Sequence, residues 1–206
     1  MRISFLLVVF FITFGSCKES SEDLNSENSA IPKERIFLIK NVEVKKSDLV
    51  LNPLEGVWYY NDEPYNGYSL KFHKNNTPEE KLGFYNGKRE GVAKTWSANG
   101  VLRIASNYSQ NKLVGDYKSY WENGNVALHV NYVDGKKEGE EKQFYSNGEI
   151  SKLRWLERGK ESGLQKAWLP NGKLYVNYEA KNGRVFGLMR ANACYKLENE
   201  KVVKKK

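Results

Sequence analysis

The stretch "GDYKSYWENGNVALHVNYVDGKKE", residues 115–138, is one unit of a repeat that decides the fold. It opens on a glycine, carries an aromatic residue five positions later, and continues through an Asn-Gly pair to a Gly-Lys pair. The opening glycine recurs every 24 residues, at Gly67, Gly91, Gly115, Gly139, Gly163 and Gly187. A fixed period of this length is typical of repeat architectures, in which each unit contacts its neighbours.

Each unit predicts one β-hairpin. The first strand runs from the opening glycine through the aromatic residue, and the Asn-Gly pair then makes a type I′ turn, because both residues tolerate positive φ. The second strand has apolar residues with a period of two, such as Leu102, Ile104 and Tyr108. The Gly-Lys segment turns the chain into the next unit. The sequence therefore predicts an all-β fold, an elongated antiparallel meander of 24-residue hairpins in a single-layer sheet.

The repeat divides the chain into five segments. Residues 1–16 are expected to be a signal peptide, residues 17–32 a flexible acidic stalk, and residues 33–66 an N-terminal cap with a partial repeat. Within this cap, residues 35–44 are expected to add a strand, and residues 57–60 to be the second strand of an earlier unit. Residues 67–190 hold the hairpin repeats. The pattern decays after Gly187, so residues 191–206 are expected to be a C-terminal cap with a basic tail.

The N-terminus predicts export. A positive start is followed by apolar residues 3–14, a run too short to span a bilayer as a mature helix but suited to a secretory signal. One interpretation is an ordinary signal peptide that is cut near Cys17. The other is a lipoprotein signal, since residues 14–17, Phe-Gly-Ser-Cys, resemble a bacterial lipobox, although leucine is usual where Phe14 stands. That resemblance implies lipidation of Cys17 and a tether to the outer membrane, on its periplasmic or surface side.

Composition limits the chemistry. The chain has 33 lysine and arginine against 25 acidic residues, a net charge of +8, which suggests anionic neighbours. Nucleic acid is not expected for an exported protein. With Cys17 acylated, Cys194 has no disulfide partner, and two histidines offer little for a metal site. Gly87-Lys88 lacks the remaining residues of a phosphate-binding P-loop. We therefore expect no enzyme activity, no cofactor and no small-molecule substrate.

Basic residues form two predicted columns. The first is Lys94, Lys118, Lys142, Lys166 and Arg190, and the second lies at the loops, from Lys88 to Arg184. The first column stands two residues before the aromatic column Trp96, Tyr120, Phe144 and Trp168, so both columns are expected on the same face of the sheet. Two interpretations remain open: the lysine stems cover the rings, with some cation–π contacts, or the columns form a groove for an anionic surface or peptide.

Other side chains receive structural interpretations. Trp96, Trp121, Trp155 and Trp168 are expected to cover the sheet as core rather than to serve as ligand platforms. Glu90 and Glu138 stand near turns and are expected to be solvated partners of nearby lysines. His129 is expected to lie in a strand without a companion.

The spacing of glycine, aromatic residue, Asn-Gly pair and aliphatic residues resembles the MORN-type repeats of bacterial proteins labelled YwqK-family antitoxins. The segment "WYYNDEPYNGYSLKFH", residues 58–73, resembles the opening of such arrays, and the resemblance covers residues 55–189. It implies protein–protein contact, assembly at membranes or phospholipid binding, and the antitoxin label implies a partner toxin. We expect a lipid-anchored, non-catalytic scaffold for an unidentified protein partner. The alternatives are binding of membrane headgroups or anionic envelope polymer, and neutralisation of a toxin.

Overall fold

The computed structural model describes residues 38–188, 195–198 and 201–204. The predicted signal peptide, Cys17, the stalk, Arg190 and Cys194 lie outside the described residues. Apart from one short 3-10 turn, the regular structure consists of β-strands. Among the described residues, no helix is long and apolar enough to cross a membrane.

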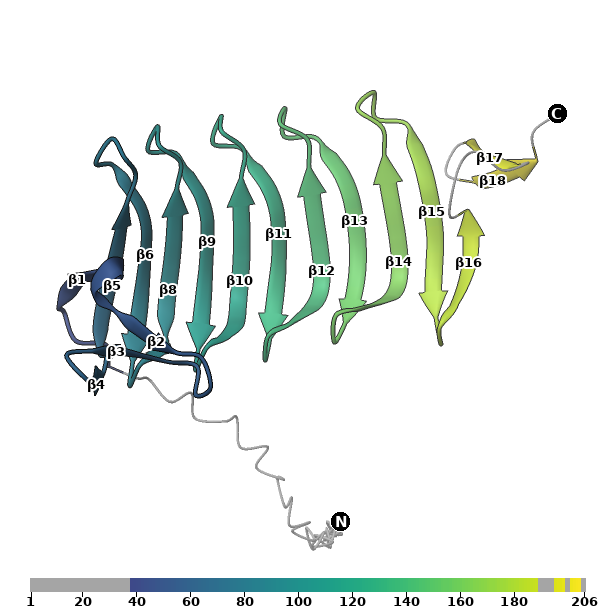
Figure 1. The fold of residues 1–206 in the computed structure, drawn as a ribbon. Helices are drawn as coiled ribbons and strands as arrows, with labels where there is room; N and C mark the ends of the chain where they lie inside the picture. Colours follow the sequence, from purple (N-terminus) through teal and green to yellow (C-terminus); the bar gives the residue numbers. More distant parts are fainter. Residues whose placement is uncertain (1–37, 189–194, 199–200, 205–206) are drawn as a thin grey trace, which may run out of the picture. The chain divides into compact units, whose positions relative to one another are not determined.

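One sheet of 13 strands contains all the repeats. From β5 onward, apart from the short β7, which pairs with β6, its strands lie side by side in chain order and each is antiparallel to the next (Figure 1). This confirms the predicted meander of hairpins. The strands of the main sheet are β1 (Glu43–Lys45), β5 (Gly67–Phe72), β6 (Pro78–Tyr85), β7 (Lys88–Arg89), β8 (Gly91–Trp96), β9 (Leu102–Ser109), β10 (Lys112–Tyr120), β11 (Val126–Val133), β12 (Lys136–Phe144), β13 (Ile150–Glu157), β14 (Lys160–Trp168), β15 (Leu174–Lys181) and β16 (Arg184–Leu188). A separate hairpin of β17 (Tyr195–Glu198) and β18 (Lys201–Lys204) follows.

The N-terminal segment forms a cap with two parts. Strand β1 pairs with β5 in parallel and adds an edge strand, but it overlaps the expected strand of residues 35–44 only at residues 43–44, and the described residues 38–42 are not in a strand. After the turn η1 (Lys46–Asp48), strands β2 (Val50–Asn52), β3 (Val57–Tyr60) and β4 (Glu63–Pro64) form a sheet of their own. The prediction that residues 57–60 belong to an earlier repeat unit is therefore wrong. Instead the Trp58 and Tyr65 rings lie 6.1 and 5.8 Å from the ring of Phe84, so this small sheet packs as a second layer on the first repeat.

The prediction that the Asn-Gly pairs form type I′ turns is wrong. In the Asn-Gly pairs at 99–100, 123–124, 147–148 and 171–172, only the glycine has positive φ, at 80°, 86°, 90° and 77°. The amide of Gly100 donates to the carbonyl of Ser97, so residues 97–100 make a four-residue turn that ends on the glycine. Both central residues have positive φ at the junctions between units instead, at 86–87, 110–111, 134–135, 158–159 and 182–183. The type I′ turns are therefore the junctions.

A bulge in the second strand of each hairpin alters which side chains share a face. Thr95 pairs with Ile104, but Trp96 pairs with Leu102, so that Arg103 is an extra residue on β9. The prediction that Leu102 and Ile104 share a face is therefore wrong, because one inserted residue reverses the alternation. The same register shift occurs at Tyr120, Phe144 and Trp168.

Candidate binding surfaces of the sheet

The register of the strands defines two faces of the repeat array. One face carries Lys94, Lys118, Lys142 and Lys166, and we call it the lysine face. These lysines share a face because each is directly paired across the strands with residues of one series, Ala105, His129, Leu153 and Asn177. The opposite face carries Tyr108, Tyr117, Tyr132 and Tyr178, and we call it the tyrosine face. Most of the buried residues of the array, such as Leu82, Val130 and Leu156, lie on the tyrosine face.

The predicted aromatic column lies on the lysine face and packs within each hairpin. On each first strand the aromatic residue stands two positions after the lysine, and it pairs with an aliphatic residue across the hairpin. The pairs are Trp96 with Leu102, Tyr120 with Val126, Phe144 with Ile150, and Trp168 with Leu174. All four rings are half-buried. Cation–π contacts occur elsewhere in the sheet, where Lys81 lies 4.8 Å from the Tyr68 ring and the Arg89 guanidinium 5.4 Å from the Tyr108 ring.

Acidic side chains interrupt the first basic column. The Nζ of Lys142 lies 2.5 Å from Glu140, and that of Lys118 lies 3.9 Å from Asp116. Lys94 is exposed and has no ion pair within the described part of the chain. The lysine face is therefore a mixed surface, and its middle strands do not present the uniform cationic ladder that the lysine positions alone suggest.

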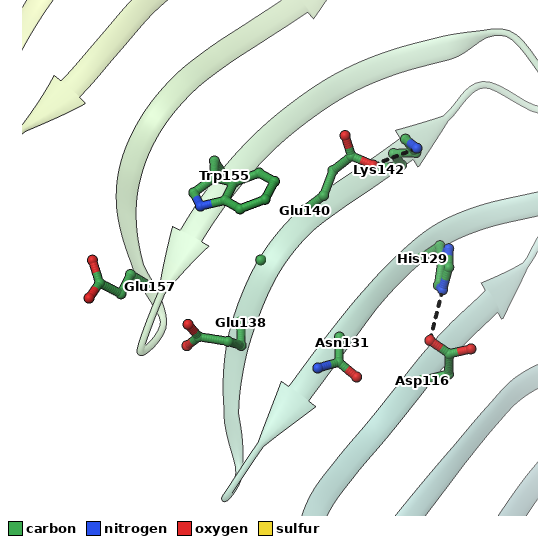
Figure 2. Close-up of a pocket in the computed structure, with 9 residues that line it drawn as sticks. Asp116, His129, Asn131, Glu138, Glu140, Lys142, Trp155 and Glu157 are labelled. Atoms are coloured by element: carbon green, nitrogen blue, oxygen red, sulfur yellow. Dashed lines mark hydrogen bonds and ion pairs between the residues drawn. The ribbon is translucent and has the colours of Figure 1, made fainter. Parts of the chain in front are cut away.

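A hollow of about 620 Å³ opens on the lysine face between β10 and β13 (Figure 2). Its lining consists of Asp116, His129, Asn131, Glu138, Gly139, Glu140, Lys142, Trp155 and Glu157, so that four carboxylates stand against one lysine and one histidine. Trp155 is 51% exposed, and Trp121 at a hairpin tip is 39% exposed. The prediction that these two tryptophans cover the sheet as core is therefore wrong.

His129 has a companion that the sequence does not indicate. Its Nε2 lies 3.1 Å from Oδ1 of Asp116 on the neighbouring strand β10. The hydrogen bond with His129 holds the pKa of Asp116 below its usual range. None of the described residues that line the hollow is a serine, threonine or cysteine. The pair can hold a charged ligand, and neither a hydroxyl nor a thiol nucleophile accompanies it in this lining.

An exposed apolar row leads from the hollow toward the end of the array. Trp155 on β13, Leu164 on β14 and Phe186 on β16 are 51%, 55% and 55% exposed. Trp155 and Leu164 line a common depression of about 340 Å³, and Glu179 pairs with both Leu164 and Phe186. One signal in the sequence marks this row: Trp155 stands at the position that asparagine occupies in the two preceding units.

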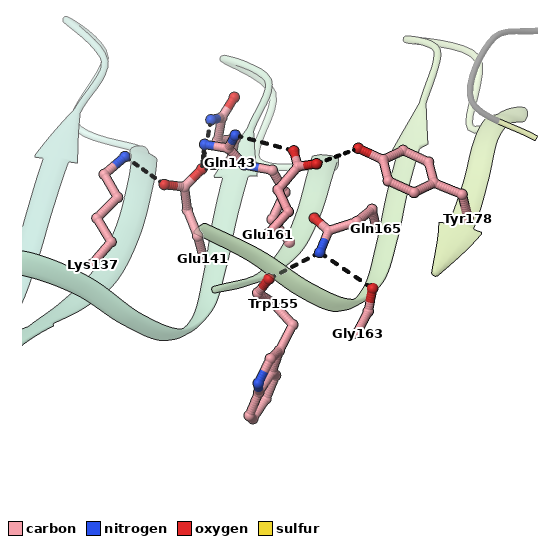
Figure 3. Close-up of polar contacts among 9 residues, drawn as sticks. Lys137, Glu141, Gln143, Trp155, Glu161, Gly163, Gln165 and Tyr178 are labelled. Atoms are coloured by element: carbon pink, nitrogen blue, oxygen red, sulfur yellow. Dashed lines mark hydrogen bonds and ion pairs between the residues drawn. The ribbon is translucent and has the colours of Figure 1, made fainter. Parts of the chain in front are cut away.

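The tyrosine face holds a buried polar network in the same strands (Figure 3). Glu141 is fully buried and accepts hydrogen bonds from Lys137 at 2.5 Å, from Gln143 at 2.9 Å and from the guanidinium of Arg154. Burial alone would raise the pKa of Glu141, but the hydrogen bonds from Lys137 and Arg154 outweigh it and hold this pKa below its ordinary value. The network satisfies a charge that is otherwise costly to bury, and it ties β12 to β13.

The network continues toward β15 through a second carboxylate. Tyr178 donates a hydrogen bond of 2.8 Å to Glu161, and burial together with this bond raises the pKa of Tyr178 to about 12. The amide of Gln165 donates to the carbonyls of Trp155 and Gly163. Figure 3 shows the indole of Trp155 directed away from this network. Its backbone is therefore fixed from the tyrosine face while its ring is presented on the other.

Two glutamates near the junctions accept hydrogen bonds from backbone amides of turns instead of pairing with lysines. Glu90 is 8% exposed and accepts the backbone amide of Gln110 at 2.9 Å. Glu138 accepts the backbone amide of Arg158 at 2.8 Å. In both cases the donor is the first central residue of a type I′ turn, 20 residues after the glutamate in the chain. The prediction of solvated partners for lysines is wrong, because an amide at a tight turn needs an acceptor.

Three segments of the array, residues 89–110, 113–134 and 137–153, match the family described as MORN repeat variant. No curated protein matches the chain. The matched segments follow one another across β7 to β13 and include every lining residue of the hollow except Trp155 and Glu157. The chain thus contains three successive repeats of the MORN variant type.

Proposed function

We propose that the protein is a non-catalytic scaffold that binds another protein through the lysine face of its repeat sheet. MORN repeats are generally associated with binding to membranes or proteins, and the family is typically non-catalytic. The observation that carries the proposal is the exposed apolar row of Trp155, Leu164 and Phe186. Large apolar side chains gathered on one open face are typical of surfaces that contact a protein.

The charges beside the row favour a protein over an anionic membrane or polymer. The carboxylates of Glu138, Glu140 and Glu157, which line the hollow together with Trp155, would repel an anionic surface. A protein partner can instead provide apolar groups for the row and polar groups for its rim. The lysines then contribute to the orientation of the partner rather than to a uniform attraction for anions.

The cellular setting of the proposal comes from the N-terminal sequence. We infer that Cys17 is lipidated and holds the array at the outer membrane of the bacterial envelope, through the acidic stalk of residues 17–32. A Cys17→Ala variant of the full chain is expected to lose acyl label and to leave the membrane fraction. Retention of the label in that variant would contradict the anchor without bearing on the lysine face.

The binding function is tested by crosslinking in cells. A photo-reactive amino acid placed at Leu164 of the full chain, on the lysine face, is expected to give a discrete adduct with one protein. The matched control places the same group at Lys152, which is exposed on the tyrosine face and pairs with Ala167. Equal adducts from both positions, or lipid adducts alone from Leu164, would overturn the proposal.

A further inference from the structure

The exposed row and the hollow beside it combine an accessible indole with uncompensated negative charge. We propose that this part of the lysine face binds an extended, lysine- or arginine-rich segment of a protein partner, with one cationic side chain placed against Trp155. The inference rests on the proposed scaffold function and names the chemical class of its partner.

The position of Trp155 suits a cationic ligand. Tryptophan has the most favourable ring for cation–π contact, and its indole is half exposed here at the edge of the hollow. Glu140, the direct cross-strand neighbour of Trp155, is paired with Lys142 (Figure 2), while Glu138 and Glu157 line the same hollow. On the far side, the Trp155 side chain lies beside Gly163, and both residues line the same depression.

The charge of the hollow is opposite to that of the chain. The protein has a net charge of +8, yet the hollow gathers four carboxylates. Lys142 offsets Glu140, and Asp116 is shared between His129 and Lys118. Within the described chain, neither Glu138 nor Glu157 forms an ion pair. A basic segment would supply the missing positive charge, whereas an anionic one would be repelled.

The order of side chains across the strands favours an extended segment. From β12 to β16 the register places Glu140, Trp155, Leu164, Glu179 and Phe186 in successive strands. Neighbouring strands lie about 4.8 Å apart, so two acidic and three apolar groups are interspersed over about 20 Å. A segment that mixes lysine or arginine with apolar residues can match this order, and a single small cation uses only one part of it.

The probe for this site is an octalysine peptide, titrated into the full chain in mild detergent and followed by calorimetry. We expect binding that weakens as salt is added and that protects a tryptophan from acrylamide quenching. Trp155→Asn is expected to weaken binding about threefold to tenfold and to remove the protected fluorescence. Asparagine fills this position in two other units, so this variant keeps a side chain that the repeat accepts.

Matched variants separate the hollow from general charge. Glu157→Gln is expected to weaken binding about twofold to fivefold, while Glu149→Gln, which removes an exposed carboxylate at a hairpin tip in the same repeat, leaves it unchanged. Absence of octalysine binding, or equal binding by Trp155→Asn, would overturn the inference. Preferential binding of octaglutamate, or of vesicles with anionic headgroups, would also overturn it in favour of the lysine column.

Failure of this inference and failure of the scaffold function give different results. If the photo-reactive group at Leu164 still captures one protein while octalysine does not bind, only the cationic class of the partner is wrong. If octalysine binds at Trp155 but Leu164 captures no protein, the site takes cations and the scaffold function is wrong.

Discussion

The side chain of Trp155 lies against Gly163 on the neighbouring strand. A Cβ atom added at Gly163 would stand 3.6 Å from Cβ of Trp155 and 3.7 Å from its Cγ and Cδ1. These are ordinary van der Waals separations, so an alanine side chain fits beside the indole. The backbone is the obstacle instead, because Gly163 has a φ of +78°, which residues with a side chain rarely adopt.

We therefore expect Gly163→Ala to lower the free energy of unfolding by about 1–2 kcal/mol, measured by urea denaturation, with the Trp155 surface retained. Gly187→Ala serves as the contrast. It shares a positive φ, at +117°, and its new Cβ would also stand 2.6 Å from the backbone carbonyl oxygen of Asn177. Gly187→Ala should cost clearly more, and equal losses would show that backbone conformation alone decides both sites.

The junction turns offer a stabilising substitution. Arg158 is the first central residue of its type I′ turn and has a φ of +49°. Of the four equivalent junctions, three have Asn86, Asp134 or Asn182 at this position and one has Gln110. Asparagine tolerates this conformation better than arginine does. Arg158→Asn should raise the free energy of unfolding by about 0.5–1 kcal/mol, seen as a higher Tm. The matched change at an exposed tip position with negative φ, Lys173→Asn, should give no gain.

The buried carboxylate of Glu141 links stability to pH. Its pKa is lowered in the folded state, so the unfolded chain binds more protons and the contribution of Glu141 is present above the ordinary carboxyl pKa of about 4.3. That contribution is lost as the pH falls through this value toward the folded pKa. Glu141→Gln should therefore destabilise the protein by about 3 kcal/mol at pH 7, because Lys137 and Arg154 lose the negative charge of their common partner and an NH2 group replaces one of its acceptor oxygens.

The pH profile distinguishes this effect from simple loss of packing. The difference in unfolding free energy between the native chain and Glu141→Gln should shrink as the pH is lowered from 6 to 3. The matched control is the same change at Glu149, which is exposed at a hairpin tip and bonds to Asn147 there. A gap that stays constant with pH would mean that the charge of Glu141 does not carry its contribution.

The repeat itself could be predicted from the sequence because its signal is local. A glycine, an aromatic residue and an Asn-Gly pair in one register report strands and reversals within a single unit. The positions of the type I′ turns could not be predicted, because glycine accepts positive φ both in the Asn-Gly turns and at the junctions. Asn99-Gly100 therefore matches the sequence of a type I′ turn but does not form one. The bulge at Arg103 has no residue signature, and it alone decides that Leu102 and Ile104 face opposite ways.

The candidate site depends on residues that occur in single units, which the period does not reveal. The lysines of the first column stand out at a spacing of 24 residues, but the partners Glu140 and Asp116 lie only two residues before Lys142 and Lys118 and occur in these units alone. Trp155 departs from the repeat at one position, and its exposure follows from the side chains across the hairpin. Deviations from the period therefore mark the candidate site better than the period does.

Weakening the contact between the N-terminal cap and the first repeat should lower stability most near the cap and progressively less along the array. Phe84 is fully buried between the repeat sheet and the cap, with the rings of Trp58 and Tyr65 against it. Phe84→Ala should cost about 3–5 kcal/mol. Because each unit of a repeat array contacts only its neighbours, hydrogen exchange should accelerate most in β3 and β6 and least in β14 and β15. Uniform acceleration over all strands would instead mean that the cap and the repeats unfold as one cooperative unit.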